Sequence, residues 1–454
     1  MKKHKNLIKL NLAIIFLVVL LGINITSADN VIAGIEMNSQ TVKEAESKNI
    51  DPEILYNQVW ELIRKDFVDQ TFNGQDWSIW KDRYKGKLKN LADSHKAIET
   101  MLASLGDRYT RFLSKKDFDD EKEAINAKLT GIGIQIGLDK SSRLIVIAPI
   151  EGTPAYTAGL RSGDEIVEIN GNPTKGISVE EAASQIKGPI GSKVTLSISR
   201  GKESLSKTIT REEIPIRSIS KGDAKILQKN VGYIRLNSFI SQESSKEMDE
   251  AIKRLSKAEG FIIDLRNNPG GLLTNAIEIS DMFLGDGIIV STVDRDGYIQ
   301  SVTADDKLST DKPVVILVNE NSASASEILS GALKDNARAK IVGARTFGKG
   351  LIQGINKLDD GSGVNITIAK YLTPSKTDIN ELGIKPDYTV KLTLEDYEGS
   401  KGPWFSDPNE LPSKRKPDDG KDLQLMKGIQ VIEEMMQVVK EKETTGNQKQ
   451  TAAL

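Results

Sequence analysis

The 454-residue chain contains no cysteine and only two histidines, His4 and His95, and 5% of its residues are aromatic. Without cysteine, the protein can form neither a disulfide nor a thiolate-bound metal site. If an N-terminal signal is removed, His95 is the only histidine left, and a histidine-based zinc centre is then excluded by counting. A cysteine nucleophile is excluded as well, and we expect no metal and no other cofactor.

Basic residues are not in excess, because 62 Lys and Arg face 64 Asp and Glu and the net charge is −2. The sequence has no basic block and no alternation of basic and aromatic residues, so nucleic acid is not an expected partner. Apolar residues make up 38% of the chain and charged residues 28%, which is typical of a folded, soluble protein. The length is sufficient for two to four domains.

The N-terminus carries the features of an export signal. Four lysines lie within the first nine residues, apolar residues follow over 12–23, and small or polar residues lead to Ala28. This order is typical of a secretory signal peptide, and the apolar run is shorter than the ~20 residues of a spanning helix. Residues 1–28 are therefore predicted to be a cleaved signal peptide or an uncleaved signal anchor.

Changes in residue pattern divide the rest of the chain. Residues 29–127 place apolar residues at helical spacing and predict an N-terminal helical region. Residues 128–212 contain short β-like runs separated by turn signals, which predict a compact β-rich domain. Over 213–395 strands alternate with helices, which indicates an α/β layered core. Residues 396–454 predict a proline-containing linker, an amphipathic helix over 423–439 and a disordered tail.

A serine-rich segment, 319–327, offers the best nucleophile in the chain. Ser324 follows a buried strand pattern and opens a helix, where unpaired backbone N–H groups can stabilise an oxyanion. A serine-rich helix N-cap is the alternative interpretation. A Ser-His-Asp triad would have to use His95, which lies in a polar helical stretch and is expected to be a solvated surface residue.

Lys349 is the candidate base, 25 residues after Ser324. A lysine accepts a proton only when it is neutral, which requires burial to lower its pKa from ~10.4. Its neighbours Phe347, Leu351 and Ile352 are apolar. In a strand, residues 349, 351 and 353 share one face, so Gln353 can orient the amine without adding negative charge.

Two glycine-rich segments admit other interpretations. Residues 264–271 form a glycine turn after a buried strand and can present N–H groups to an anion. Residues 343–350 have the glycine and lysine spacing of a phosphate-binding loop. Gly350, however, stands where that motif needs a magnesium-binding hydroxyl, and a strand pattern follows instead of a helix. Nucleotide binding is therefore disfavoured.

Taken in order, these residues resemble the carboxyl-terminal-processing peptidases, also called tail-specific proteases. The resemblance covers residues 59–390 and is carried by segments 105–113, 128–212, 264–271, 322–327, 346–350 and 383–387. Residues 66–77 are similar to the branch found in cyanobacteria and chloroplasts. The resemblance implies a PDZ domain at 128–212 and a crotonase-like layered α/β peptidase core at 213–395.

The resemblance also implies roles for individual residues. Ser324 would be the nucleophile, Lys349 the general base and Gln353 the residue that orients the lysine. The backbone N–H groups of Gly270 and Ala325 would form the oxyanion hole. The PDZ domain would hold a peptide carboxylate in its loop, and many relatives have an arginine where this chain has Lys187. The implied peptide-binding residues are Gly131, Ile132, Gly133, Ile134 and Lys187.

The expected function is that of an exported serine endopeptidase that recognises protein C-termini and cleaves near them. Its partners would be proteins with free, apolar C-termini, and the helices near both chain ends would allow a homo-oligomer. We expect it in the periplasm or a space like the thylakoid lumen, with membrane association through its N-terminal segment. The alternative is a catalytically inactive PDZ-type scaffold protein of the cell envelope.

Overall fold

The structure is a computed structural model that describes residues 50–125, 128–139, 141–150, 152–215, 217–220, 222–306, 308–405 and 415–451. The predicted export signal at 1–28 lies outside these residues. Among the helices of the described ranges, none has both the length and the hydrophobicity of a membrane span.

The N-terminal region is helical, as predicted. Its helices are α1 (Pro52–Asp66), α2 (Ser78–Asp82), α3 (Leu91–Ala103) and, after a short strand β1 (Arg111–Leu113), α4 (Lys115–Ile125). Asp51 caps α1 by accepting a hydrogen bond from the Glu53 N–H, and Pro52 suits the first turn. The buried faces of α1 and α3 pack on Val364 and Ile366 of the long strand β18 (Gly363–Leu372), so this region is joined to the rest of the chain by a shared core.

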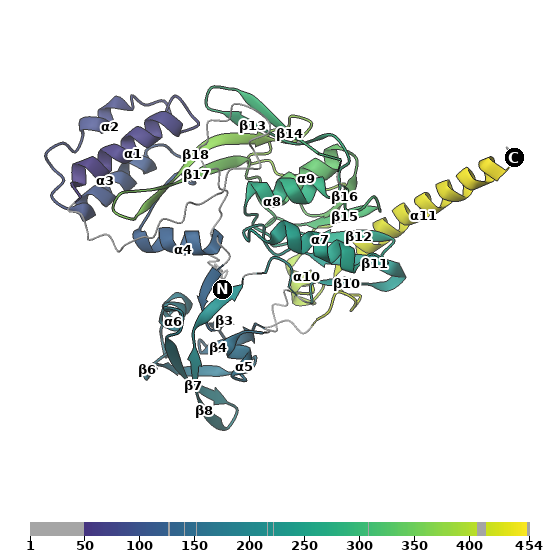
Figure 1. Cartoon of the computed structure of the whole chain (residues 1–454), viewed down its shortest axis with the longest axis horizontal. Coiled ribbons are helices and arrows are strands. Elements are labelled where there is room, and N and C mark those ends of the chain that lie inside the picture. The colour runs from purple at the N-terminus through teal and green to yellow at the C-terminus, as the bar shows by residue number, and fades with distance from the viewer. Residues whose placement is uncertain are drawn as a thin grey trace, which may run out of the picture.

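The β-rich domain forms a separate lobe (Figure 1). Its strands pair in the order β3-β4-β5-β7-β8, which leaves β3 at one edge, and β2 and β9 form a two-stranded ribbon at its base. Its elements are β2 (Lys128–Gly131), β3 (Ile134–Leu138), β4 (Leu144–Pro149), α5 (Pro154–Thr157), β5 (Glu165–Ile169), β6 (Asn172–Pro173), α6 (Val179–Ile186), β7 (Lys193–Arg200), β8 (Glu203–Thr210) and β9 (Glu212–Pro215).

The core is a sheet between two helical layers. The sheet order is β10 (Ala224–Ile226), β11 (Val231–Arg235), β12 (Gly260–Asp264), β15 (Val314–Val318), β16 (Ala339–Gly343) and β19 (Tyr388–Thr389). All neighbouring pairs are parallel except β10 with β11. Alternate residues of β12 and β15 point to opposite layers: Ile263 and Ile316 pack with α7 (Ser244–Arg254), α8 (Leu273–Asp281) and α9 (Ala325–Asp335), whereas Ile262 and Leu317 pack with α11 (Leu423–Thr451).

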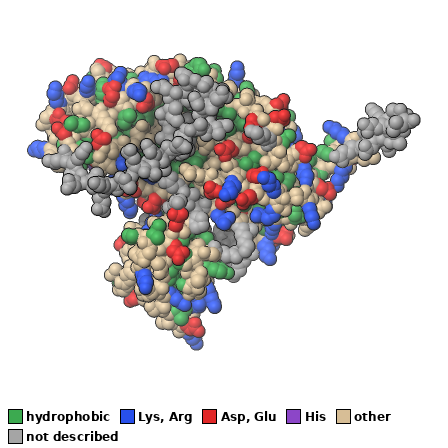
Figure 2. Space-filling view, in the orientation of Figure 1, with side chains coloured by type: hydrophobic (Ala, Val, Ile, Leu, Met, Phe, Trp, Pro, Cys, Tyr) green, Lys and Arg blue, Asp and Glu red, His purple; other side chains and the backbone are tan. Residues whose placement is uncertain are grey.

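A second sheet joins the core to the N-terminal region. β18 (Gly363–Leu372) is its long central strand and pairs with β1, with β17 (Leu351–Lys357) and with β13 (Ile288–Asp294), beyond which lies β14 (Ile299–Thr303). Figure 1 shows β17 and β18 between the N-terminal helices and the α/β layers. On the face in Figure 2, acidic and basic side chains are interspersed. The predicted layered, multidomain fold class is confirmed.

The C-terminal prediction was wrong in two respects. The last helix, α11, runs to Thr451 and projects from the body instead of ending in a disordered tail (Figure 1). Beyond Met436 it is supported by polar contacts, including a Gln437–Glu441 hydrogen bond and an ion pair between Lys440 and Glu259. A short helix, α10 (Leu394–Glu398), also runs across the expected start of the linker at residue 396.

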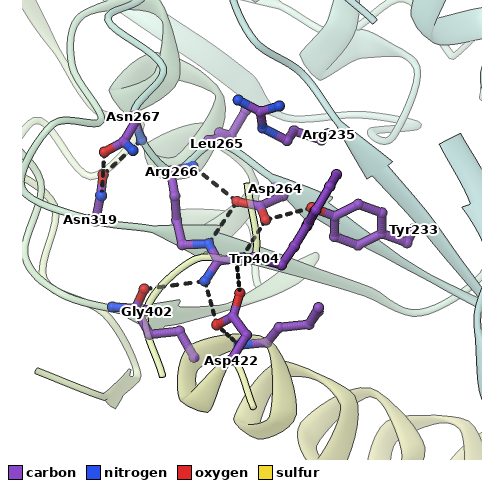
Figure 3. A network of polar contacts seen from close by, with 12 residues as sticks. Tyr233, Arg235, Asp264, Leu265, Arg266, Asn267, Asn319, Gly402, Trp404 and Asp422 are labelled. Carbon is purple, nitrogen blue, oxygen red and sulfur yellow. Dashed lines mark hydrogen bonds and ion pairs between the residues drawn. The ribbon is translucent and has the colours of Figure 1, made fainter. Parts of the chain in front are cut away.

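Trp404 and Asp422 of the C-terminal segment take part in a buried network of polar contacts around Arg266 (Figure 3). The fully buried Arg266 guanidinium binds both carboxylate oxygens of Asp264, at 2.9 and 2.6 Å, and Asp422 at 2.7 Å. Tyr233 donates a hydrogen bond to Asp264, and the Trp404 indole donates one to Tyr233. The network therefore ties the C-terminal segment to the start of the 264–271 loop.

Removing the cation from this network is predicted to destabilise the fold. Arg266→Met leaves the Asp264 and Asp422 carboxylates buried without a counter-charge, which costs about 3–5 kcal/mol. Urea unfolding measures this cost. Lys253→Met is the control, because Lys253 is mostly exposed in its ion pair with Asp249 and should contribute at most about 1 kcal/mol. Equal losses in the two variants would contradict a structural role for the network.

Candidate active site

Ser324 lies between β15 and α9 in a strained backbone conformation. Its φ of 55° and ψ of −116° fall outside the regions that non-glycine residues favour, at a cost of about 1–3 kcal/mol. Neighbouring contacts hold this geometry: the Ala323 N–H donates to the Asn268 carbonyl at 3.1 Å, and the Ser322 hydroxyl donates to the Leu265 carbonyl at 2.8 Å. The Ser324 hydroxyl is buried and has no hydrogen-bond partner among the described residues. A hydroxyl without a hydrogen-bond partner in the described part of the chain therefore lies at the N-terminus of α9.

The 264–271 loop approaches Ser324 at Gly270. A Cβ on Gly270 would lie 2.8 Å from the Ser324 Cβ and 2.9 Å from the Ala325 nitrogen, and φ is +100°, so only glycine fits. Ala325 is the first residue of α9, and its N–H has no acceptor within the helix. The Gly270 N–H donates at 2.9 Å to the Asn268 side chain. Thus the two predicted oxyanion residues are adjacent, and the Gly270 donor is occupied by a neighbouring amide oxygen.

Glu327 joins the serine and lysine segments. One oxygen of its fully buried carboxylate accepts hydrogen bonds from the backbone N–H groups of Ser324, at 2.8 Å, and Lys349, at 2.9 Å. The other accepts from the Gly348 N–H at 2.7 Å and the Thr346 hydroxyl at 2.5 Å. Burial raises the pKa of the carboxyl, and these hydrogen bonds oppose that rise. Sequence reasoning assigned Glu327 no role, although its spacing from Ser324 is that of a capping box.

Lys349 is almost completely buried, with 1% of its surface exposed. Burial lowers its pKa to about 8, and the Arg111 charge adds to this effect, while Asp107, Glu121 and Glu327 oppose it. The Tyr371 hydroxyl lies within hydrogen-bond distance of the backbone carbonyls of both Lys349 and Ser324. The backbones of the two predicted catalytic residues are therefore held together by two shared side chains, Glu327 and Tyr371.

Gln353 is buried beside the lysine segment, but the strand is irregular there. A β-bulge between Ile352 and Gln353 interrupts the simple alternation expected for residues 349, 351 and 353. The Gln353 amide nitrogen donates to the Thr367 hydroxyl at 3.4 Å, and its amide oxygen is buried without a hydrogen-bond partner in the described part of the chain. Thr367 donates in turn to Asp107 at 2.5 Å.

The lobe at 128–212 has a helix packed next to its edge strand. α6 packs next to β3, whose other edge is unpaired within the described strands. Gly133 has a φ of +77°, and a Cβ there would overlap Thr153. Ile132 is buried, whereas Ile134 is partly buried against the lobe's core. Lys187, directly after α6, binds Asp120 of α4 at 3.3 Å and so links the lobe to the enzyme body.

Two other sequence interpretations are resolved by the structure. His95 is not a solvated surface residue, because it is partly buried and its Nε2 lies 2.6 Å from Asp360. The 343–350 segment is not a phosphate-binding loop: its Gly348 and Lys349 N–H groups bind Glu327, and a strand follows it. The described residues contain no cluster of His, Asp or Glu suited to a metal ion.

Comparison with known proteins agrees with this geometry. The model of peptidase family S41 matches residues 230–390, the PDZ domain model matches 121–199, and the tricorn protease C1 domain model matches 51–100. A carboxyl-terminal-processing protease of Synechocystis is 43% identical over 74% of this chain and 80% of its own length. The chloroplastic carboxyl-terminal-processing peptidase 3 of Arabidopsis thaliana is 37% identical over 73% of this chain and 67% of its own.

Solved structures extend the comparison. One titled photosystem II D1 C-terminal processing protease is 33% identical and superposes with a TM-score of 0.52 over 75% of this chain and 94% of its own. A putative S41 protease from Bacteroides fragilis has a TM-score of 0.53 at 15% identity over 87% of this chain and all of its own, and shares the fold. These matches show that the chain belongs to the carboxyl-terminal-processing serine peptidases, in the branch found in cyanobacteria and chloroplasts.

Proposed function

We propose that this peptidase captures free protein C-termini in its PDZ groove and cleaves nearby through an acyl-enzyme formed by Ser324 and Lys349. The observation that carries the proposal is that Glu327 and Tyr371 each bind the backbones of both Ser324 and Lys349. The Ser324 backbone is strained and its hydroxyl has no hydrogen-bond partner among the described residues, and the Lys349 side chain is buried. Burial makes the lysine a usable base, because with a pKa of about 8 roughly a tenth of the amines are neutral at pH 7.

The chemistry has two stages. The Ser324 oxygen attacks the scissile carbonyl carbon while the Lys349 amine takes the hydroxyl proton. The Ala325 N–H stabilises the oxyanion. The Gly270 N–H joins it once its hydrogen bond to the Asn268 side chain breaks. The C–N bond then breaks and the lysine ammonium protonates the leaving amine. In the second stage neutral Lys349 takes a proton from water, whose oxygen attacks the ester carbonyl carbon. The C–O bond to Ser324 then breaks and the lysine ammonium returns the proton to the Ser324 oxygen, which releases the acid and free Ser324.

Peptide capture would use the free edge of β3. An extended C-terminus adds to this edge as a further strand, and loop amides of residues 131–134 bind its carboxylate. Substrates of this class are proteins with free apolar C-termini. We place the enzyme in an extracytoplasmic compartment, on the basis of the chloroplastic relatives and of the expected export signal.

Both members of the dyad are predicted to be essential. Ser324→Ala and Lys349→Ala should each abolish cleavage of a protein with an apolar C-terminus, with the fold checked by circular dichroism. In the wild type, kcat/KM should rise with pH to a plateau with a midpoint near pH 8, because the neutral amine is the active form. Labelling by a serine-reactive probe should follow the same profile. A protein that neither cleaves nor reacts with the probe would instead be the inactive scaffold.

Glu327→Gln should impair the chemical step. In the amide, an NH₂ group replaces one carboxylate oxygen and faces backbone N–H groups that need an acceptor. The serine and lysine segments therefore shift. Because a displacement of about 1 Å can cost 10²-fold, we expect kcat to fall on that order with KM little changed. Steady-state kinetics measure this split, and Glu320→Gln on the exposed neighbouring turn is the control. Wild-type kcat in the Glu327 variant would refute the positioning role.

PDZ capture predicts sensitivity to the substrate's terminal carboxylate. Amidating the C-terminus should raise KM by roughly 10–100-fold, the value of a charge-assisted hydrogen bond of about 1.5–3 kcal/mol. Gly133→Ala, whose Cβ would overlap Thr153, should raise KM for the free acid and remove the difference between acid and amide. Gly163→Ala has a similar φ and an open Cβ position, and should keep the difference. Equal KM for acid and amide in the wild type would rule out carboxylate capture.

A further inference from the structure

The segment between α3 and β1, residues 106–110, reaches the active site from outside the matched peptidase region. Asp107 shapes it by accepting hydrogen bonds from the Tyr109 N–H at 3.0 Å and the Thr110 hydroxyl at 2.7 Å. The strand that follows, β1, pairs with β18 with Arg111 opposite Asn365. The Thr110 hydroxyl also accepts from the Thr367 N–H at 3.0 Å. The 106–110 segment is therefore fixed to the strand beside Gln353.

Tyr109 lies against the catalytic amine. The Lys349 Nζ is 4.8 Å from the centroid of the Tyr109 ring, and the ring is half-buried. Arg108, which is exposed, donates to the Tyr109 hydroxyl at 2.8 Å, and its guanidinium carbon lies 4.9 Å from the ring centroid. The half-buried ring thus packs against a buried amine and also contacts an exposed arginine.

Asp107 connects the same segment to Gln353. Its Oδ2 accepts a hydrogen bond from Thr367, and the Thr367 hydroxyl accepts one from the Gln353 amide. Thr367 and Gln353 are direct cross-strand partners on β18 and β17. Since the amide nitrogen of Gln353 faces Thr367, its unbonded amide oxygen is available elsewhere in the site.

We propose that the 106–110 segment forms a wall of the active site with two functions. The Tyr109 ring excludes water from the Lys349 amine, and Asp107 positions Gln353 through the Thr367 hydroxyl. The proposal rests on the Ser324–Lys349 mechanism and adds two positioning residues from the N-terminal region. It gives this region a part in catalysis besides its packing against the peptidase sheet.

Water exclusion outweighs the attraction between the ring and the ammonium. Full desolvation can lower the pKa of a lysine by about 3–5 pKa units, whereas contact with the face of an aromatic ring raises it by about one pKa unit. The other charged and titratable groups facing the lysine are Arg111 of β1, Glu121 of α4, Glu327 of α9, Asp107 and the Tyr371 hydroxyl of β18. None of these groups is substituted in the Tyr109 variants. Arg108, however, loses its contacts with the ring in Tyr109→Ala, and Tyr109→Phe, which loses the hydroxyl that Arg108 binds but keeps the ring, is the control for the released arginine.

The test compares Tyr109→Ala with Tyr109→Phe in the full-length enzyme, using pH profiles of kcat/KM. Opening the wall in Tyr109→Ala should move the rising limb to higher pH by about one unit, so that the rate at pH 7 falls about tenfold. At pH values above both limbs the two rates should converge, which general structural damage would not allow. Tyr109→Phe keeps the ring and should keep the position of the wild-type limb.

The outcomes separate the wall from the dyad. A rising limb that is unchanged in Tyr109→Ala, or a rate that stays low at high pH, would overturn the water-excluding role. If the wild type itself shows no limb, or Lys349→Ala retains activity, the Ser-Lys mechanism fails instead. Should Tyr109→Ala not fold, Tyr109→Leu, which keeps most of the apolar cover, is predicted to fold and to keep a limb near that of Tyr109→Phe; a limb as far shifted as one unit would refute the wall.

The role of Asp107 has its own variant. Thr367→Val removes the hydroxyl that links Asp107 to Gln353 and preserves the size of the buried side chain. We expect kcat to fall with KM unchanged, because Gln353 loses its partner but the PDZ groove is not altered. A wild-type kcat in this variant would overturn the connection through Thr367.

Discussion

The carboxylate of Glu327 is the interaction on which the catalytic arrangement depends. It lies in the first turn of α9 and accepts four hydrogen bonds, two of them from the backbone N–H groups of Ser324 and Lys349. A buried carboxylate is costly unless it is fully hydrogen-bonded, and a buried N–H or O–H donor is costly without an acceptor. The four donors therefore stabilise the charge, and the carboxylate gives each of them an acceptor. This mutual requirement holds the serine turn and the lysine loop in one geometry although 25 residues separate them.

Three distant parts of the chain complete the site. The 106–110 segment covers the lysine from the N-terminal side. The 264–271 loop brings Gly270 against Ser324. Near its start, Arg266 of the loop forms a buried ion pair with Asp422 of the C-terminal segment. Residues from both sides of the matched peptidase region, 230–390, therefore contact the candidate site or the loop beside it.

Electrostatics and burial act in opposite directions at the lysine. Three carboxylates, Asp107, Glu121 and Glu327, favour its charged form, and Arg111 disfavours it. Burial is nevertheless the dominant effect and brings the pKa to about 8. An amine with this pKa is neutral often enough to act as a base and still protonated often enough to act as an acid. The protein obtains this balance without histidine, of which the described part of the chain has only His95, paired with Asp360.

Much of the fold could be predicted from local patterns: the helical N-terminal region, the β-rich lobe, the alternation of strands and helices, and a serine at the start of a helix all follow from the spacing of apolar residues and from turn signals. The end of α11 could not, because side-chain pairs and an ion pair with Glu259 extend it past its apolar face. The partnership of His95 with Asp360 was equally hidden, since 265 residues separate them.

By itself, the sequence determined which groups are available for chemistry: one activatable serine turn, one lysine among apolar neighbours, and no thiol or histidine cluster to compete with them. Tertiary structure alone decided that Glu327 bridges the backbones of Ser324 and Lys349, that the Tyr109 ring lies beside the lysine amine and that the Asn268 side chain accepts the Gly270 N–H. Residue types and local spacing reveal what a chain can do, but burial and hydrogen bonding between distant segments arise only when the chain folds, and they set the pKa and the geometry.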